Sequence, residues 1–266
     1  FLETPPCFFP EHAAAAGDAG CHVYVAKPVA VDVPGCLSIA ESAKKATARK
    51  QVFLVDFQVP THPFNMETVK RCKEGLIGKI GLLSSIYCDE AFADPPKTAT
   101  IESRLQGLIW VNDTDIGGGM LVNAGIHAID AALWLAGACP ISAMGSAAKI
   151  TPDSHGDTND VYSITYQFED GLILNHRGEH VGNTHGFACS CIAYGQFGYA
   201  EINYEGNAGI RGNKGGYEGG QITGLYNDGI KTNLDIFRKN ITEGQYDNPT
   251  AASGVIVETS SAAGTA

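Results

Sequence analysis

The strongest constraint on this fold is one apolar segment, GGGMLVNAGIHAIDAALWLAG, at residues 117–137. Its apolar residues fall on nearly every face of a helix, which predicts a helix over residues 120–136 that is surrounded by protein. The segment also contains Asn, His and Asp, so it is not predicted to cross a membrane. A chain that buries such a helix needs other elements packed on all its sides.

Three polar residues interrupt this helix: Asn123, His127 and Asp130. Spacings of four and then three residues place them on one helix face, where buried polar groups must find partners or face a cavity. A core helix whose polar groups bind neighbouring backbone is one interpretation. A binding site at the helix N-terminus is the other, and Gly117–Gly119 favour it because glycine lets backbone and ligand approach closely.

Composition narrows the classes of function. The 266 residues carry a formal net charge of -11, and without a Lys/Arg cluster they are not expected to bind nucleic acid or an anionic membrane surface. The eight cysteines show no C-x-x-C spacing, which is typical of a reduced protein with isolated thiols. We therefore expect a cytoplasmic protein.

The first 58 residues alternate helix and strand signals. Helices are predicted over 11–20 and 33–47, and strands over 21–28 and 52–58. This order predicts a parallel α/β layer.

After residue 58 the pattern changes to hairpins. Segments 161–168 and 172–181 flank an Asp170-Gly171 turn, and two further strands are predicted over 187–195 and 199–204. The glycine-rich stretch 206–229 is interpreted as a meander of turns rather than a phosphate cradle, because no strand-to-helix context surrounds it. Helices are predicted around Met66–Leu76 and Ile230–Ile241, and a last one begins at Asn248-Pro249. The chain is thus predicted to divide near residue 58.

Four motifs carry a resemblance to a known family. TPP at 4–6, AGCHVYVAKP at 19–28, GGGMLVNAGIHAID at 117–130 and DIFRKNITEGQYDNPT at 235–250 stand in the order and spacing typical of that family. The chain resembles the Gfo/Idh/MocA family of NAD(P)-dependent sugar and polyol oxidoreductases.

The resemblance implies an α/β fold of two parts. Residues 1–58 would be the C-terminal part of a dinucleotide-binding Rossmann domain, a partial parallel layer. Residues 59–266 would form an α+β domain for substrate binding and oligomerisation, an open-faced, mainly antiparallel sheet with helices on one face. The family's G-x-G-x-x-G turn would precede residue 1, so we expect a fragment, which leaves open whether it is active by itself.

The resemblance also implies roles for individual residues. His127 would take the proton from a substrate hydroxyl, and Lys27 would hold that oxygen. Asn123 stands where the family has Asp, and could orient the imidazole or bind a sugar hydroxyl. Taken alone, Lys27 could equally be a strand-end lysine that reaches solvent. The remaining expected contacts are Thr4, Pro5, Pro6, Lys27 and Pro28 with NAD or NADP, and Asp130, Asn175 and Arg177 with substrate.

Several alternatives stay open. A zinc hydrolase built on His176, His180 and His185 is disfavoured, because residues four apart on a strand lie roughly 13 Å from one another. These histidines could line a sugar site with Asn175, Arg177 and Glu179, or belong to a polar outer face. The protein could be a non-catalytic subunit, or a family member that cleaves glycosides through transient oxidation. The expected partners are a sugar or cyclitol substrate and further copies of the chain, as a homodimer or homotetramer.

Overall fold

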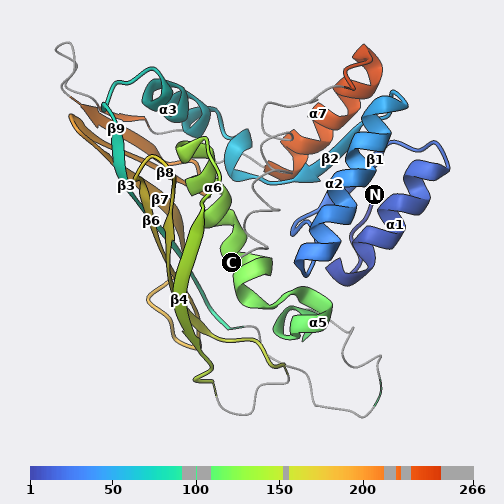
Figure 1. Ribbon diagram of the computed structural model, residues 1–266, viewed down its shortest axis with the longest axis horizontal. Helices are drawn as coiled ribbons and strands as arrows, with labels where there is room; N and C mark the ends of the chain where they lie inside the picture. Colours follow the sequence, from blue (N-terminus) through green and yellow to red (C-terminus); the bar gives the residue numbers. More distant parts are fainter. Residues whose placement is uncertain (92–99, 101–108, 152–155, 213–219, 223–228, 247–266) are drawn as a thin grey trace.

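Two sheets share one hydrophobic core in the computed structural model, which describes residues 1–91, 100, 109–151, 156–212, 220–222 and 229–246 (Figure 1). The smaller sheet pairs β1 (Val23–Ala26) with β2 (Phe53–Asp56) in parallel. Leu2 lies beside β1: its N–H donates to the Tyr24 carbonyl at 2.8 Å, and its carbonyl accepts from the Ala26 N–H at 2.9 Å. The predicted parallel layer is confirmed.

Helices cover both faces of this small sheet. Helices α1 (Phe9–Asp18) and α2 (Val33–Ala48) agree with the predicted helices, and they pack in the same core as Val25 and Val55. Helix α7 (Gly229–Glu243) packs against the opposite face, where Phe237 contacts Tyr24 and Leu54. A helix from the far side of residue 58 therefore completes the first layer.

The larger sheet has the strand order β10-β9-β8-β7-β3-β6-β5-β4. The predicted hairpin over the Asp170-Gly171 turn is confirmed as β5 and β6, and the predicted strands after it are β7 and β8. The central strand β3 was not predicted; it pairs in parallel with β6 and antiparallel with β7. Within the glycine-rich stretch the described residues form β9 and β10, whereas the helix predicted from Asn248 lies outside the described residues. The strands are β3 (Ile80–Asp89), β4 (Ser142–Ala148), β5 (Val161–Gln167), β6 (Ile173–His180), β7 (Ala188–Gly195), β8 (Gly198–Asn203), β9 (Ala208–Gly212) and β10 (Gly220–Ile222).

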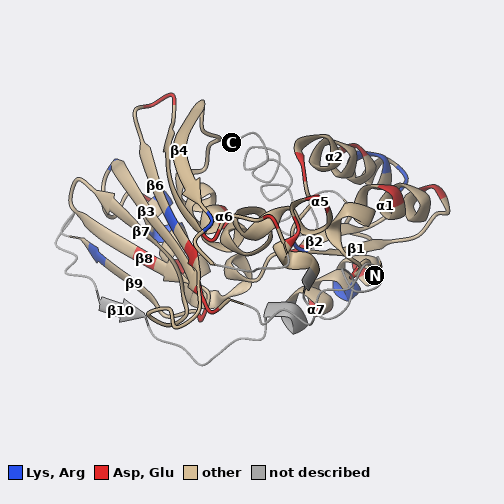
Figure 2. Ribbon diagram, turned by 90° about the horizontal axis from the view of Figure 1, so that it is seen from below, with Lys and Arg blue, Asp and Glu red and all other residues tan. Residues whose placement is uncertain are grey.

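The apolar segment lies between the two sheets. Helix α6 (Ile126–Ala136) packs on β3 and β7, and in both ribbon views it lies between the large sheet and the α1–α2 layer (Figures 1 and 2). By length and composition residues 114–136 could cross a membrane, but 78% of their most apolar window is buried inside the protein, as in a core helix. The remaining helices are α3 (Pro63–Lys73) and α5 (Thr114–Gly117), with 3₁₀ turns at Pro6–Phe8, Val59–Thr61 and Ile109–Asn112.

The beginning of the predicted helix differs from a regular α-helix. Residues Leu121–Gly125 form a π-helical turn, and α6 proper begins only at Ile126. Gly118 and Gly119 precede this turn with φ of 83° and 77°, a backbone conformation that glycine adopts without strain. The π-turn widens the helix where Asn123 lies.

The large sheet has two different faces. Leu83 on β3, Leu174 on β6 and Cys191 on β7 are buried on the face that α6 covers. Side chains of the opposite face are largely exposed, including Ile173 at 40% and Tyr194 at 44%. An open-faced, mainly antiparallel sheet is confirmed.

Candidate functional site

Lys27 follows β1 and connects the two halves of the molecule. Its Nζ donates to the Asn123 carbonyl at 2.9 Å and lies 3.5 Å from Asn123 Oδ1, across 96 residues of sequence. Burial lowers the pKa of Lys27 to about 8, and the negative charge of nearby Asp56 partly opposes that decrease. Lys27 is therefore a half-buried cation that contacts the polar stripe, not a lysine that simply extends into solvent.

Asn123 is buried within the π-turn, and its Nδ2 donates to the Gly117 carbonyl at 3.4 Å. The glycines before it are required by protein packing: a Cβ at Gly117 would stand 2.4 Å from the Trp110 carbonyl oxygen, and one at Gly119 would stand 2.9 Å from Thr158 Oγ1. The close approach predicted from this triplet is thus to other parts of the chain. It fixes the turn that presents Asn123 to Lys27.

His127 lies one helical turn further on and is 4% exposed. Its ring packs edge-on against Phe57 and Tyr204, with centroids 6.2 and 5.0 Å away. Nδ1 is buried and has no hydrogen-bond partner among the described residues. Burial, with the charge of Lys27, lowers the pKa of His127 well below its ordinary value, so the imidazole is neutral at pH 7. A satisfied core histidine would have a partner at this nitrogen.

Asp130 completes the stripe and is 2% exposed. It faces Cys189 of β7, whose thiol pKa is raised mainly by burial and further by Asp130. Cys189 and Lys27 also interact electrostatically. Cys189 is not among the predicted site residues; the available signal is the alternation in FACSCIAYG, which directs Cys189 and Cys191 to the same face.

The predicted cofactor residues gather at one edge of the small sheet. Because Leu2 pairs beside β1, Thr4, Pro5 and Pro6 leave the sheet at the same end as Lys27 and Pro28. Carboxyl ends of parallel strands are where ligands bind in open α/β sheets.

Asn175 and Arg177, the other predicted substrate contacts, are not brought to this site. Both are exposed on the face of β6 opposite α6, where Asn175 accepts from Thr165 at 3.0 Å and Arg177 donates to Cys88 Sγ at 3.7 Å. The intervening His176 faces α6 instead. As for the zinc alternative, the described residues hold no group of three or more His, Cys, Asp or Glu side chains able to bind a metal ion.

Comparison with known proteins identifies the family. Residues 67–201 match the GFO/IDH/MocA C-terminal domain. The chain belongs to the GFO/IDH/MocA family. D-glucoside 3-dehydrogenase of Escherichia coli (strain K12) is 30% identical over 174 residues, which cover 64% of this chain and 45% of that protein. The match thus spans less than half the length of this relative.

Solved structures share the fold of this GFO/IDH/MocA protein. An aldose-aldose oxidoreductase from Caulobacter crescentus, complexed with glycerol, has a TM-score of 0.75 and 18% identity, covering 96% of this chain and 72% of that chain. A levoglucosan dehydrogenase in complex with NADH and levoglucosan has a TM-score of 0.75 and 20% identity, covering 97% of this chain and 76% of that chain. These likenesses confirm the α/β class of the fold.

Proposed function

We propose that the full-length protein transfers a hydride between a sugar or polyol hydroxyl and NAD or NADP. One observation carries the proposal: His127 is buried and neutral, its Nδ1 has no partner within the described part of the chain, and it lies one turn from Asn123, which holds the Lys27 ammonium. A base and a cation at adjacent positions are what oxidation of an alcohol requires. The dehydrogenase relative and the NADH-bound neighbour support the same assignment.

The residues present fit the reactive end of a nicotinamide cofactor. Thr4, Pro5, Pro6, Lys27 and Pro28 leave the parallel sheet at its carboxyl edge, and Lys27 and the His127 stripe meet beside it. These five residues would line the nicotinamide. When bound, the cofactor would supply the hydride acceptor.

The chain's own groups have complementary tasks. The Lys27 ammonium would bind the substrate oxygen and stabilise the charge that develops as its proton leaves. His127 is unprotonated at neutral pH, so its Nδ1 could accept that proton without first losing one. Asn123 orients Lys27 by accepting its hydrogen bond, and the buried Asp130 would contribute to substrate binding.

Three further assignments accompany this function. Residues 1–58 are proposed as the dinucleotide-binding part and 59–266 as the substrate and oligomerisation part, with α7 returning to cover the small sheet. The exposed face of the large sheet would be where copies associate as a dimer or tetramer. The cytoplasm is the proposed location, on the grounds of the cysteine pattern.

The test is His127→Ala in the full-length protein. If His127 is the base, turnover of a sugar or cyclitol should fall on the order of 10² to 10⁴-fold while the melting temperature changes little in comparison. His12→Ala, on α1, is the control and should leave turnover unchanged. Unaltered turnover per folded molecule in His127→Ala would end the case for catalysis by this residue.

A further inference from the structure

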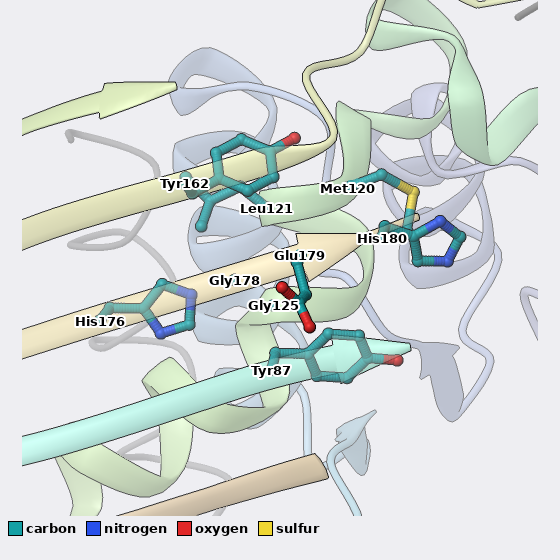
Figure 3. Close-up of a pocket in the computed structure, with 9 residues that line it drawn as sticks. All are labelled: Tyr87, Met120, Leu121, Gly125, Tyr162, His176, Gly178, Glu179 and His180. Carbon is teal, nitrogen blue, oxygen red and sulfur yellow. The ribbon is translucent and has the colours of Figure 1, made fainter. Parts of the chain in front are cut away.

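Tyr87 and Asp89 lie near the end of β3, on the sheet face where Tyr87 packs against the π-turn. Tyr87 stands opposite Cys189 in the β3–β7 register, and Asp89, two residues further along the strand, points to the same side. Figure 3 shows the Tyr87 hydroxyl directed towards the end of β3, away from His176. Both side chains therefore belong to the part of the sheet that carries Cys189, the residue that faces Asp130.

A row of aromatic rings joins Tyr87 to the proposed base. Tyr87 packs edge-on against Phe187, with ring centroids 6.0 Å apart. Phe187 packs against Tyr204 at 5.8 Å, and Tyr204 packs against His127 at 5.0 Å. Nδ1 of His127 is buried and has no hydrogen-bond partner among the described residues. Aromatic walls with a few polar groups at fixed positions are typical of small-molecule sites, and this row has a base at one end and the Asp89 carboxylate at the other.

The Asp89 carboxylate is fixed in place and keeps unused hydrogen-bond acceptor positions. Oδ2 accepts from the Tyr87 hydroxyl at 3.2 Å, and Oδ1 accepts from the Glu90 N–H at 2.8 Å. An ionised carboxylate accepts about four hydrogen bonds, so about two positions stay open. Asp89 is half-buried, and no Lys or Arg within the described residues forms an ion pair with it. Sugar hydroxyls, which donate hydrogen bonds, match such a group.

The charges around Cys189 are mainly negative. Burial raises the thiol pKa of Cys189, and the positive charge of Lys27 opposes that increase. Asp130 and Asp89 raise the same pKa further, so one cation and two carboxylates act on this sulfur. His180, which lies opposite Asp89 in the β3–β6 register, does not neutralise the carboxylate: burial lowers the His180 pKa, so its imidazole is neutral at pH 7. A ligand with a negative charge at this place would be repelled.

We propose that Asp89, oriented by Tyr87, determines the substrate class: it binds hydroxyl groups of an uncharged sugar or cyclitol and excludes sugars that carry a carboxylate. This inference rests on the proposed function, because the reacting hydroxyl is placed at Lys27 and His127. A bound hydroxyl donates a hydrogen bond to Asp89, whereas a carboxylate in its place has no hydrogen to donate and brings two like charges together. Specificity of this kind comes from an unfavourable interaction with the wrong ligand.

The test measures sugar binding to the full-length protein by ligand-observed NMR titration, with NADH and NADPH present because neither can accept a hydride. D-glucose is compared with D-glucuronate and D-galactose with D-galacturonate; each acid has a carboxylate in place of the hydroxymethyl group. The wild type should bind at least one neutral sugar, and should bind its acid about 10-fold more weakly or worse. Asp89→Asn keeps the shape and removes the charge, so this ratio should fall to about 3-fold or less. Asp89→Glu keeps the charge and should keep the ratio.

Glu179→Gln is the matched control, because it removes one negative charge from the opposite face of the sheet, where Glu179 accepts from Thr184 at 2.8 Å. Its ratio should equal that of the wild type. The proposal is overturned if the wild type binds an acid as tightly as its neutral sugar, if neither neutral sugar binds, or if Asp89→Asn changes the ratio no more than Asp89→Glu or Glu179→Gln does. The proposed function is tested separately: full turnover in His127→Ala, with the ratio still dependent on Asp89, would refute the catalytic assignment and support the role of Asp89.

Discussion

Replacing Asn123 by Asp tests how the site controls the charge of Lys27. Oδ1 of Asn123 lies 3.5 Å from Lys27 Nζ, and Asp has nearly the same shape, so Asn123→Asp puts a carboxylate oxygen at about that distance. At an effective dielectric constant of about 20, Coulomb's law gives about 5 kcal/mol, or roughly 3.5 pKa units, as an upper value. Lys27 is only partly buried, and solvent screening reduces the effect.

The expected result is an increase in the Lys27 pKa of about one to two units, from about 8 towards its ordinary 10.5. The same carboxylate raises the pKa of His127, because it favours the imidazolium form. In the wild type, Lys27 loses its proton as the pH rises through about 8; in Asn123→Asp it stays charged to a higher pH. The high-pH limb of turnover in the full-length protein should therefore move upward.

The direct assay is an NMR titration of ¹³Cε-labelled lysine, with the Lys27 signal assigned from its loss in Lys27→Met. Asn123→Leu is the matched control: it has a similar volume and no charge, so it cannot raise the Lys27 pKa. If wild-type Lys27 titrates near 10.5, burial does not lower its pKa and the reasoning is refuted. Identical Lys27 titrations in Asn123→Asp and Asn123→Leu would refute the contact itself.

Three other predictions concern stability and assembly. Asn233→Ala removes the Nδ2 donor 2.5 Å from the buried Asp56 carboxylate, and urea titrations should show the free energy of unfolding lowered by about 1–3 kcal/mol. Asp235→Ala, at an exposed position of the same helix, should have a smaller effect, and equal effects would show that the Asn233–Asp56 hydrogen bond does not hold α7 in place. His176 binds a proton more readily in the unfolded chain than in the folded one, so the free energy of unfolding should fall by up to roughly 3 kcal/mol as the pH decreases from about 6.5 to about 4. In His176→Leu the free energy of unfolding should depend less steeply on pH, and equal slopes in the two proteins would exclude His176 as the cause. Ile173→Lys on the open sheet face should shift sedimentation towards the monomer, and an unchanged assembly would place the interface elsewhere.

The sequence by itself determined the features that depend on near neighbours. Helix and strand alternation in residues 1–58 is a local pattern of apolar spacing and capping, such as Asp32 accepting from Gly35 at the start of α2. The β5–β6 hairpin follows from the Asp170-Gly171 turn, where Gly171 has φ of 87°. The alignment of His127 and Asp130 on α6 follows from spacing alone, because an α-helix places residues three and four apart on one face.

The tertiary structure decided what depends on residues far apart in the sequence. Strand β3 contains Ser84 and Ser85 in place of a clear alternation, and it is a central strand only because β6 and β7 pair with it from about 90 residues or more away. Which face of β6 meets α6 is set by that register, and so the His176 side chain lies on the covered face, near Gly125. The Lys27–Asn123 contact spans 96 residues, and the Asp56–Asn233 bond spans 177. Local sequence determines which residues share a face of their own helix or strand, whereas the long-range packing of elements determines which residues those side chains contact.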